Sequence, residues 1–326
     1  MPDDVIRVEN LVKKFGAIAA VDGIQLDVQS GQIFGFLGPN GAGKSTTIKI
    51  LATLLKPTSG KAAVAGYDVL TKPTEVRKSI GLVFQDQSLD DRLTAEENLW
   101  FHAMLYDLPS DVFTQRLEDV LRLVDLLDRR KSLVRTFSGG MKRRLEIARG
   151  LLHHPKVLFL DEPTLGLDPQ TRNAIWKHVK ALREAKGSTV FMTTHYMEEA
   201  EHCDKIAIID HGKIQAVDSP LNLKRMVGGD KIIVGGDESL LDDIQRSYNV
   251  AAQKLGNEIH FQMDRGAEFV PRLVSEFAGR IKSIQVKEPS LEDVFLRLTG
   301  HSIRTDEGKA VDQMRQAAQL WRRGRR

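Results

Sequence analysis

The sequence is poor in cysteine and lacks any long run of apolar residues. Cys203 is the single cysteine among 326 residues, so an internal disulfide is excluded, which fits a reducing cytosol. No stretch approaches the roughly 18 consecutive apolar residues that a membrane-spanning helix requires. The N-terminal residues include Asp3 and Asp4 and no apolar core, so we expect no secretory signal peptide.

The chain also lacks a strong excess of charge of either sign. Its net charge is +3, from 47 basic and 44 acidic residues. The basic excess lies in 304–326, where seven Lys and Arg residues accompany three acids, so the rest of the chain is close to neutral. We therefore expect no nucleic-acid partner. The basic tail is either a solvated chain end or a contact for anionic lipid at a membrane surface.

Short β-rich runs alternate with helical stretches over residues 5–230. Hydrophobic residues make up 41% of the chain, enough for a core, and the alternation is typical of an α/β fold. The expected strands are 5–10, 24–28, 32–37, 62–65, 80–84, 157–161, 189–193 and 206–210. Two runs, 33–37 and 157–160, are apolar throughout, as expected for strands buried on both faces of a mainly parallel sheet.

A helical insertion is expected at about 90–152, where the β pattern stops. Thr94 and Glu97 have the spacing of a capping box, and apolar residues then recur at helical spacing. We interpret the apolar stripe of this insertion as core packing. Its residues are Leu99, Trp100, Met104, Phe113, Leu117, Val120, Leu121, Val124 and Leu127.

A small α+β domain is expected at 226–303, after a larger domain at 1–225. The expected elements are strand 231–235, helix 238–247, strands 249–255 and 258–263, helix 267–277, strand 281–287 and helix 290–298. Ser290 and Asp293 again have capping-box spacing. We expect this domain to close its own small core and to act as an accessory or dimerisation domain.

A phosphate-binding loop is predicted at 38–46, between an apolar strand and a helical stretch. The pattern is Gly, four residues, then Gly-Lys-Ser, and its backbone N–H groups can surround a phosphate at a helix N-terminus. Lys44 is expected to reach the β- and γ-phosphates, and the Ser45 hydroxyl to bind Mg²⁺. The candidate residues are Gly38, Pro39, Asn40, Gly41, Ala42, Gly43, Lys44, Ser45 and Thr46. The alternative is a glycine-rich turn without a ligand.

Two further motifs indicate which reaction the phosphate-binding loop serves. Asp161 and Glu162 end an apolar strand, where the first acid can hold Mg²⁺ and the second can polarise a water for attack on phosphate. Ser138, Gly139 and Gly140 precede a helical run and predict a second anion site. If that anion site binds the nucleotide held by a second copy of the chain, the two copies must face each other head to tail. The alternatives are a solvated acidic pair and an ordinary helix cap.

These motifs occur in the order found in the nucleotide-binding subunit of an ATP-binding-cassette (ABC) transporter, which the chain resembles over about 5–225. The matching positions are Phe15, 38–46, Gln85, Ser138, Gly139, Gly140, Asp161, Glu162, Asp168 and His195. The resemblance implies a P-loop nucleotidase α/β fold with antiparallel β and helical subdomains. It also implies that ATP and Mg²⁺ bind, and that Lys44, Glu162 and His195 support ATP hydrolysis.

The resemblance implies a role for each remaining match. Phe15 stacks on adenine, Gln85 contacts Mg²⁺ and water near the membrane subunit, Asp168 lies in a loop that crosses the dimer interface, and His195 contacts the γ-phosphate. Taken from the residues alone, Phe15 could be a core residue, Gln85 a surface strand end, Asp168 a helix cap and His195 structural.

The sequence departs from the commonest family pattern at two points. The usual Leu-Ser-Gly-Gly-Gln is Phe-Ser-Gly-Gly-Met at 137–141, so the contacts of the Gln amide are lost at Met141. The interfacial loop has Leu165-Gly166 where a pair of small residues is common. The anion-binding serine and glycines remain, so we still expect hydrolysis.

The run Ser-Gly-Gly-Met-Lys-Arg-Arg-Leu at 138–145 resembles drug and antibiotic exporters of the daunorubicin-resistance type. So does 288–300, which opens with Glu-Pro-Ser-Leu. This implies an ATPase subunit that forms a homodimer and powers a separate integral membrane permease from the cytoplasmic face of the cell membrane. The alternatives are a non-transport ABC ATPase acting on ribosomes or DNA, a non-catalytic nucleotide-gated scaffold, and an importer subunit. The sequence of this subunit does not predict the transported compound, because the residues that contact that compound belong to the permease.

Overall fold

The computed structural model describes residues 4–237 and 239–303, and the predicted basic tail at 304–326 lies outside them. The described residues form two compact units, which we call the N-terminal unit, up to Val217, and the C-terminal unit, Asp218–Ile303. Among the described helices, none combines the length and the apolar character needed to cross a membrane.

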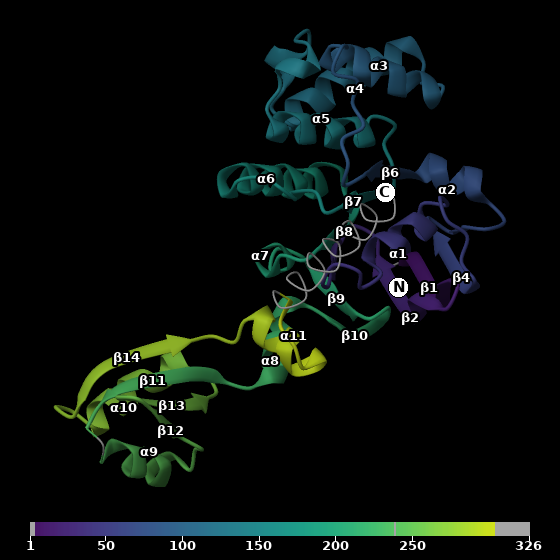
Figure 1. Cartoon of the computed structure of the whole chain (residues 1–326). Coiled ribbons are helices and arrows are strands. Elements are labelled where there is room, and N and C mark those ends of the chain that lie inside the picture. The colour runs from purple at the N-terminus through teal and green to yellow at the C-terminus, as the bar shows by residue number, and fades with distance from the viewer. Residues whose placement is uncertain (1–3, 238, 304–326) are drawn as a thin grey trace, which may run out of the picture. The chain divides into compact units, whose positions relative to one another are not determined.

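A six-stranded sheet forms the centre of the N-terminal unit (Figure 1). Its strands, in spatial order, are β10 (Lys213–Asp218), β9 (Lys205–Asp210), β3 (Ile33–Leu37), β8 (Thr189–Thr194), β7 (Val157–Asp161) and β6 (Ile80–Val83). The pairs β9–β3, β3–β8, β8–β7 and β7–β6 are parallel. Every residue of β3, β7 and β8 is buried, which explains the continuous apolar runs 33–37 in β3 and 157–160 in β7.

A second, antiparallel sheet packs on the same core. Its order is β2 (Ile18–Gln29), β1 (Asp4–Phe15), β4 (Ser59–Val64) and β5 (Tyr67–Asp68). Both long strands extend well beyond the expected 5–10 and 24–28, because a tight turn at Gly16 continues their pairing as a hairpin. The strands β5 and β10 were not expected from the sequence.

The helices of the N-terminal unit follow the strands in the expected order. They are α1 (Lys44–Leu51), α2 (Pro73–Ser79), α3 (Ala95–Leu105), α4 (Ser110–Leu123), α5 (Gly139–Leu151), α6 (Pro169–Lys186) and α7 (Met197–Ala200). Figure 1 shows α3, α4 and α5 gathered in one helical region, which covers the predicted insertion. The capping box of Thr94 and Glu97 is formed at the start of α3, so that prediction is confirmed.

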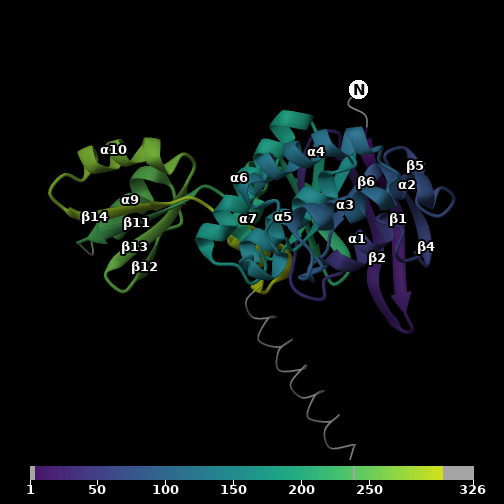
Figure 2. The same cartoon turned by 90° about the horizontal axis from the view of Figure 1, so that it is seen from above.

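The C-terminal unit has a four-stranded antiparallel sheet, visible from two sides in Figures 1 and 2. Its order is β12 (Gln253–Leu255), β13 (Glu258–Met263), β11 (Asp230–Gly236) and β14 (Ile281–Lys287). The helices α9 (Leu240–Tyr248) and α10 (Gly266–Glu276) bury Leu240, Ile244 and Leu273 against the sheet residues Val234 and Phe261. This unit therefore has a hydrophobic core of its own.

The division between the units lies earlier than the expected 225/226. The helix α8 (Pro220–Val227) packs on α11 (Leu291–Thr299), which is the last helix of the C-terminal unit in the sequence. Arg297 of α11 also donates a hydrogen bond to the carbonyl oxygen of Val227 at 2.6 Å. This contact joins segments about 70 residues apart, so sequence pattern alone could not show that α8 belongs with the C-terminal unit.

Candidate functional site

The carboxyl ends of four neighbouring strands carry the predicted site residues. The loop 38–46 follows β3, His195 follows β8, Asp161 and Glu162 lie at the end of β7, and Gln85 follows β6. In parallel sheets this edge is where ligands bind, because all strand ends and the loops after them meet there. The strand order β3-β8-β7-β6 therefore gathers residues that lie far apart in the chain.

The loop 38–46 has a backbone that only glycine accommodates at two positions. Gly43 has φ of 105°, and a Cβ there would lie 2.3 Å from the carbonyl oxygen of Ala20. A Cβ at Gly38 would lie 2.2 Å from the carbonyl oxygen of Ile209. No side chain caps the N-terminus of α1, so its first amides face the loop. This cradle fits a phosphate group.

Lys44 places its ammonium group between the loop and the acids of β7. Its Nζ donates to the carbonyl oxygens of Gly38 and Pro39 at 2.8 and 3.0 Å. The same Nζ lies 3.2 Å from Glu162 Oε1, and both side chains are buried. A buried charge of this kind needs an opposite charge nearby, and Glu162 supplies it.

Asp161 lies within hydrogen-bond distance of two hydroxyl groups. Ser45 Oγ and Thr193 Oγ1 donate to Asp161 Oδ1 at 3.0 and 2.6 Å. Thr193 Oγ1 in turn accepts from the backbone N–H of Glu162 at 3.0 Å. A carboxylate and a hydroxyl at this separation are hard oxygen ligands of the kind that Mg²⁺ prefers. Thr193 was not singled out from the sequence, although it lies two residues before His195.

Glu162 is buried beside His195 as well as Lys44. Its Oε1 lies 3.4 Å from His195 Nδ1. Burial by itself raises the pKa of Glu162, but the hydrogen bond with His195 and the positive charge of Lys44 outweigh it, so the pKa lies below its usual range. Glu162 is therefore an ionised carboxylate at neutral pH, with φ of 46° that turns it away from the strand direction.

The structure does not bring every predicted residue to this edge within one chain. Ser138 caps α5, where its Oγ accepts from the N–H of Met141 at 3.2 Å, and Figure 1 shows α5 apart from α1. Gly140 packs on α6, because a Cβ there would lie 2.3 Å from Thr171 Cγ2. Ser138 and Gly139 are exposed.

The remaining candidates are also exposed. Phe15 is the last residue of β1, and 51% of its surface is accessible to solvent. Gln85 is exposed in the irregular segment that follows β6. Asp168 caps α6, because its carboxylate accepts from the backbone N–H and the hydroxyl of Thr171 at 3.0 and 2.6 Å. These bonds lower the pKa of Asp168. The helix-cap interpretation of Asp168 is thus correct, and a further role at an interface is compatible with its exposure.

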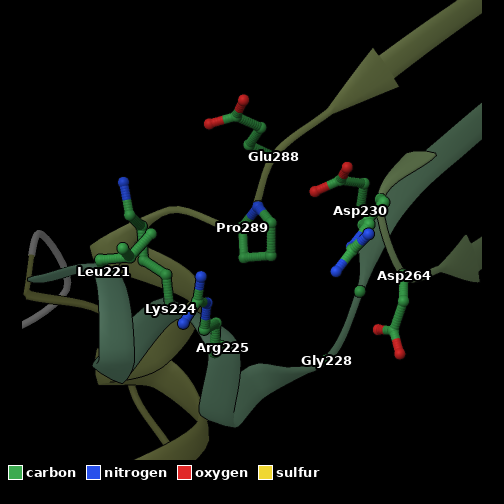
Figure 3. A pocket seen from close by; sticks show the side chains of 10 residues that line it. Leu221, Lys224, Arg225, Gly228, Asp230, Asp264, Glu288 and Pro289 are labelled. Atoms are coloured by element: carbon green, nitrogen blue, oxygen red, sulfur yellow. The ribbon is translucent and has the colours of Figure 1, made fainter. Parts of the chain in front are cut away.

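A separate pocket of about 660 Å³ lies within the C-terminal unit (Figure 3). It lies where the chain passes between the α8–α11 pair and the sheet, at Gly228 and Pro289. Its lining carries three basic and three acidic residues: Lys224, Arg225, Arg265, Asp230, Asp264 and Glu288. The pocket contains none of the predicted nucleotide-binding residues, and its balanced charge does not favour a polyphosphate.

The chain matches two known protein families, one in each unit. A family model described as ABC transporter matches residues 21–165, and one described as the C-terminal domain of ATP-binding proteins like DrrA1-3 matches 219–299. The linearmycin resistance ATP-binding protein LnrL of Bacillus subtilis is 39% identical, with 92% of this chain and 100% of the relative covered. The daunorubicin resistance ATP-binding protein DrrA2 of Streptomyces coeruleorubidus is 41% identical, with 93% and 98% covered.

Solved structures of ATP-binding cassettes resemble the chain as well. CbiO1 of Clostridium perfringens, part of the ABC transporter complex CbiONQ, has a TM-score of 0.65 and 26% identity over 76% of this chain and 96% of its own. The cassette MJ0796, in a dimeric post-hydrolysis state with ADP and phosphate, has a TM-score of 0.59 and 28% identity over 66% and 98%. The predicted fold class is thus confirmed.

Proposed function

The chain belongs to the ATP-binding subunits of ABC transporters, which are ATPases, and from this premise we propose that it powers the export of a drug, an antibiotic or another hydrophobic compound. The names of its relatives, linearmycin and daunorubicin resistance proteins, support export as the direction. The single observation that carries the hydrolytic role is the buried cluster of Lys44, Glu162 and His195 beside the phosphate loop.

We propose that the loop 38–46 holds the phosphates of ATP and that Phe15 stacks on adenine. Ser45, Asp161 and Gln85 would hold Mg²⁺, which shields phosphate charge when it is bound. Lys44 stabilises negative charge on the β- and γ-phosphates. The ionised Glu162 can accept a proton from water, and His195, 3.4 Å away, orients its carboxylate.

We propose that two copies of the chain share two nucleotides. The exposed Ser138 and Gly139, at the solvent-accessible start of α5, would complete the site of the partner copy. Asp168 is exposed at the start of α6 and would lie at the same interface. Hydrolysis would remove the γ-phosphates that tie the two copies together, so that the dimer opens. The C-terminal unit would contribute to dimerisation.

We propose that the permease docks on α3, at the cytoplasmic face of the cell membrane. Four large apolar side chains are 45–66% exposed on this helix: Trp100, Phe101, Met104 and Leu105. Their spacing places them on one face of α3. An exposed apolar patch of this size favours a protein partner. The expected core packing of the apolar stripe is confirmed for Leu99, Leu117, Val120, Leu121 and Val124, which are buried. It was wrong for Trp100 and Met104, because Leu99 and Ala103 are the residues of α3 that face the core.

The test is a Glu162→Gln variant of the full chain, recovered from its native membranes in detergent with ATP. Loss of the general base should slow hydrolysis by about 100- to 10,000-fold and accumulate an ATP-bound dimer. Mass spectrometry of the captured material should identify a multi-span membrane protein that lacks its own cassette.

Full turnover by the Glu162→Gln protein would contradict the catalytic assignment. Capture of ribosomal proteins or DNA in place of a membrane protein would instead favour a non-transport ATPase. The matched control is Asp237→Asn, which removes a carboxylate from the C-terminal unit and should leave hydrolysis unchanged.

A further inference from the structure

Arg143 of α5 is a buried arginine that uses all of its hydrogen-bond donors. Guanidinium has five N–H groups, and each finds an acceptor here. Nε donates to the carbonyl oxygen of Pro163 at 2.7 Å, and Nη2 donates to those of Asp161 and Glu162 at 3.1 and 3.2 Å. Nη1 donates to the carbonyl oxygen of Phe84 and to Glu146 Oε2. Only 5% of the residue is exposed.

Three of these acceptors are consecutive residues around the catalytic carboxylate. Glu162 has φ of 46°, a left-handed conformation that a non-glycine residue adopts only when its surroundings hold it. Thr193 holds the N–H of Glu162, and Arg143 holds its carbonyl oxygen. The direction of the Glu162 side chain therefore depends on Arg143, although Arg143 binds the backbone of Glu162 and not its carboxylate.

The same arginine also fixes the segment that contains Gln85. Phe84, just before Gln85, is bound through its carbonyl oxygen to Arg143. Ser88, shortly after it, donates its backbone N–H to Glu146 Oε1 at 2.8 Å. Arg143 and Glu146 form a buried ion pair at 3.0 Å on one face of α5. The pair thus holds both ends of the Gln85 segment.

We propose that Arg143 is a positioning residue that couples the helix carrying Ser138 and Gly139 to the catalytic carboxylate of the same chain. A displacement of α5 moves Arg143 and Glu146 together, and with them the backbone of Glu162 and the Gln85 segment. The inference rests on the proposed ATPase function, and it adds a route by which closure at Ser138 and a movement of the Gln85 segment both act on Glu162.

The test is Arg143→Lys in the full chain, compared with Arg116→Lys. Lysine keeps the charge that pairs with Glu146 but has three donors on one nitrogen, so it cannot hold the four carbonyl oxygens together. We expect kcat to fall by about tenfold or more while the Kd for ATP stays within about twofold, because the acceptors of Arg143 lie outside the phosphate loop. Arg116, which donates to the carbonyl oxygen of Leu152 at the other end of α5, should be neutral in both measurements.

A double-mutant cycle with Glu162→Gln separates positioning from a general structural role. If Arg143 acts through Glu162, the Arg143→Lys effect on single-turnover hydrolysis should disappear in the Glu162→Gln background. Persistence of the full effect in that background, or a loss of ATP affinity that parallels a lower melting temperature, would overturn the proposal. So would an unchanged kcat in Arg143→Lys when Glu162→Gln is slow, an outcome that leaves the proposed ATPase function standing.

If Arg143→Lys does not fold, the neutral pair Arg143→Gln with Glu146→Gln is the second variant. It avoids leaving one buried charge without its partner, which is the main cause of misfolding in such pairs. We expect the same result as for Arg143→Lys, namely a reduced kcat with the affinity for ATP retained. Wild-type kcat in this folded double variant would overturn the proposal.

Discussion

Glu162 combines two properties that oppose each other in most carboxylates, since it is buried and yet ionised. Burial favours the protonated form, whereas the His195 hydrogen bond and the Lys44 ammonium favour the carboxylate. The second effect is the larger, so the pKa is lowered. By linkage, this ionisation stabilises the fold above the unfolded pKa of Glu, about 4.3, and the contribution is lost as the pH falls through the lower folded pKa.

At this scale, His195→Ala should raise the pKa of Glu162, because it removes a group that lowers it. We expect the acid limb of the single-turnover rate to move to higher pH in the variant, in addition to a lower rate at pH 7. The measurement is the pH dependence of hydrolysis by wild type, His195→Ala and the control Tyr196→Phe, which keeps the ring whose centroid lies 4.0 Å from that of His195. An unshifted acid limb in His195→Ala would show that His195 does not control the ionisation of Glu162.

At the scale of elements, α3 is a helix that is apolar on its outer face as well as on the face it buries. Ala95, Leu99 and Ala103 are buried, while the opposite face exposes Trp100, Phe101, Met104 and Leu105. The Thr94–Glu97 capping box fixes the N-terminus of α3. Asn98 fixes the segment that precedes the helix, because its side-chain amide donates to the carbonyl oxygen of Asp90 at 3.0 Å. The helix therefore does not depend on the exposed side chains for its own folding.

Because of this, Trp100→Glu together with Phe101→Glu should weaken permease binding without reducing basal ATP hydrolysis by the isolated chain. Charge placed in an apolar interface must be desolvated without a partner, and loss of such anchors costs about 2 kcal/mol or more of binding. The measurement is co-purification with the permease from membranes, with Leu255→Glu on the C-terminal unit as the control. Co-purification at the wild-type level would exclude α3 as the docking helix.

At the scale of the whole molecule, two separate cores imply two units that respond separately to ligand. The C-terminal core contains Phe261 and Leu273 and none of the nucleotide-binding residues. ATP binds only the folded N-terminal unit under our proposal, so it stabilises that unit by mass action, by about 2.7 kcal/mol when ATP is at 100 times its Kd.

We accordingly expect Phe261→Ala to destabilise the C-terminal unit by about 3–5 kcal/mol and to leave ATP affinity unchanged. The measurement is calorimetric unfolding with and without ATP and Mg²⁺, using Glu162→Gln to prevent turnover. ATP should raise the melting temperature of one transition, and Phe261→Ala should lower that of the other. A single transition that both changes shift together would show that the units unfold as one.

Local sequence determined much of this protein by itself. The phosphate loop is one continuous run at 38–46, and both capping boxes join residues three apart, so neighbours in the chain suffice to predict them. The fold class likewise follows from the alternation of apolar strands and helices. The tertiary structure decided what depends on distant segments meeting. It brought Arg143 within hydrogen-bond distance of the carbonyl oxygens of Glu162 and Phe84, and Thr193 within that of Asp161. It also packed α8 on α11 and left Trp100 outside the core. These contacts are set by strand order and helix packing, which no local spacing in the sequence specifies.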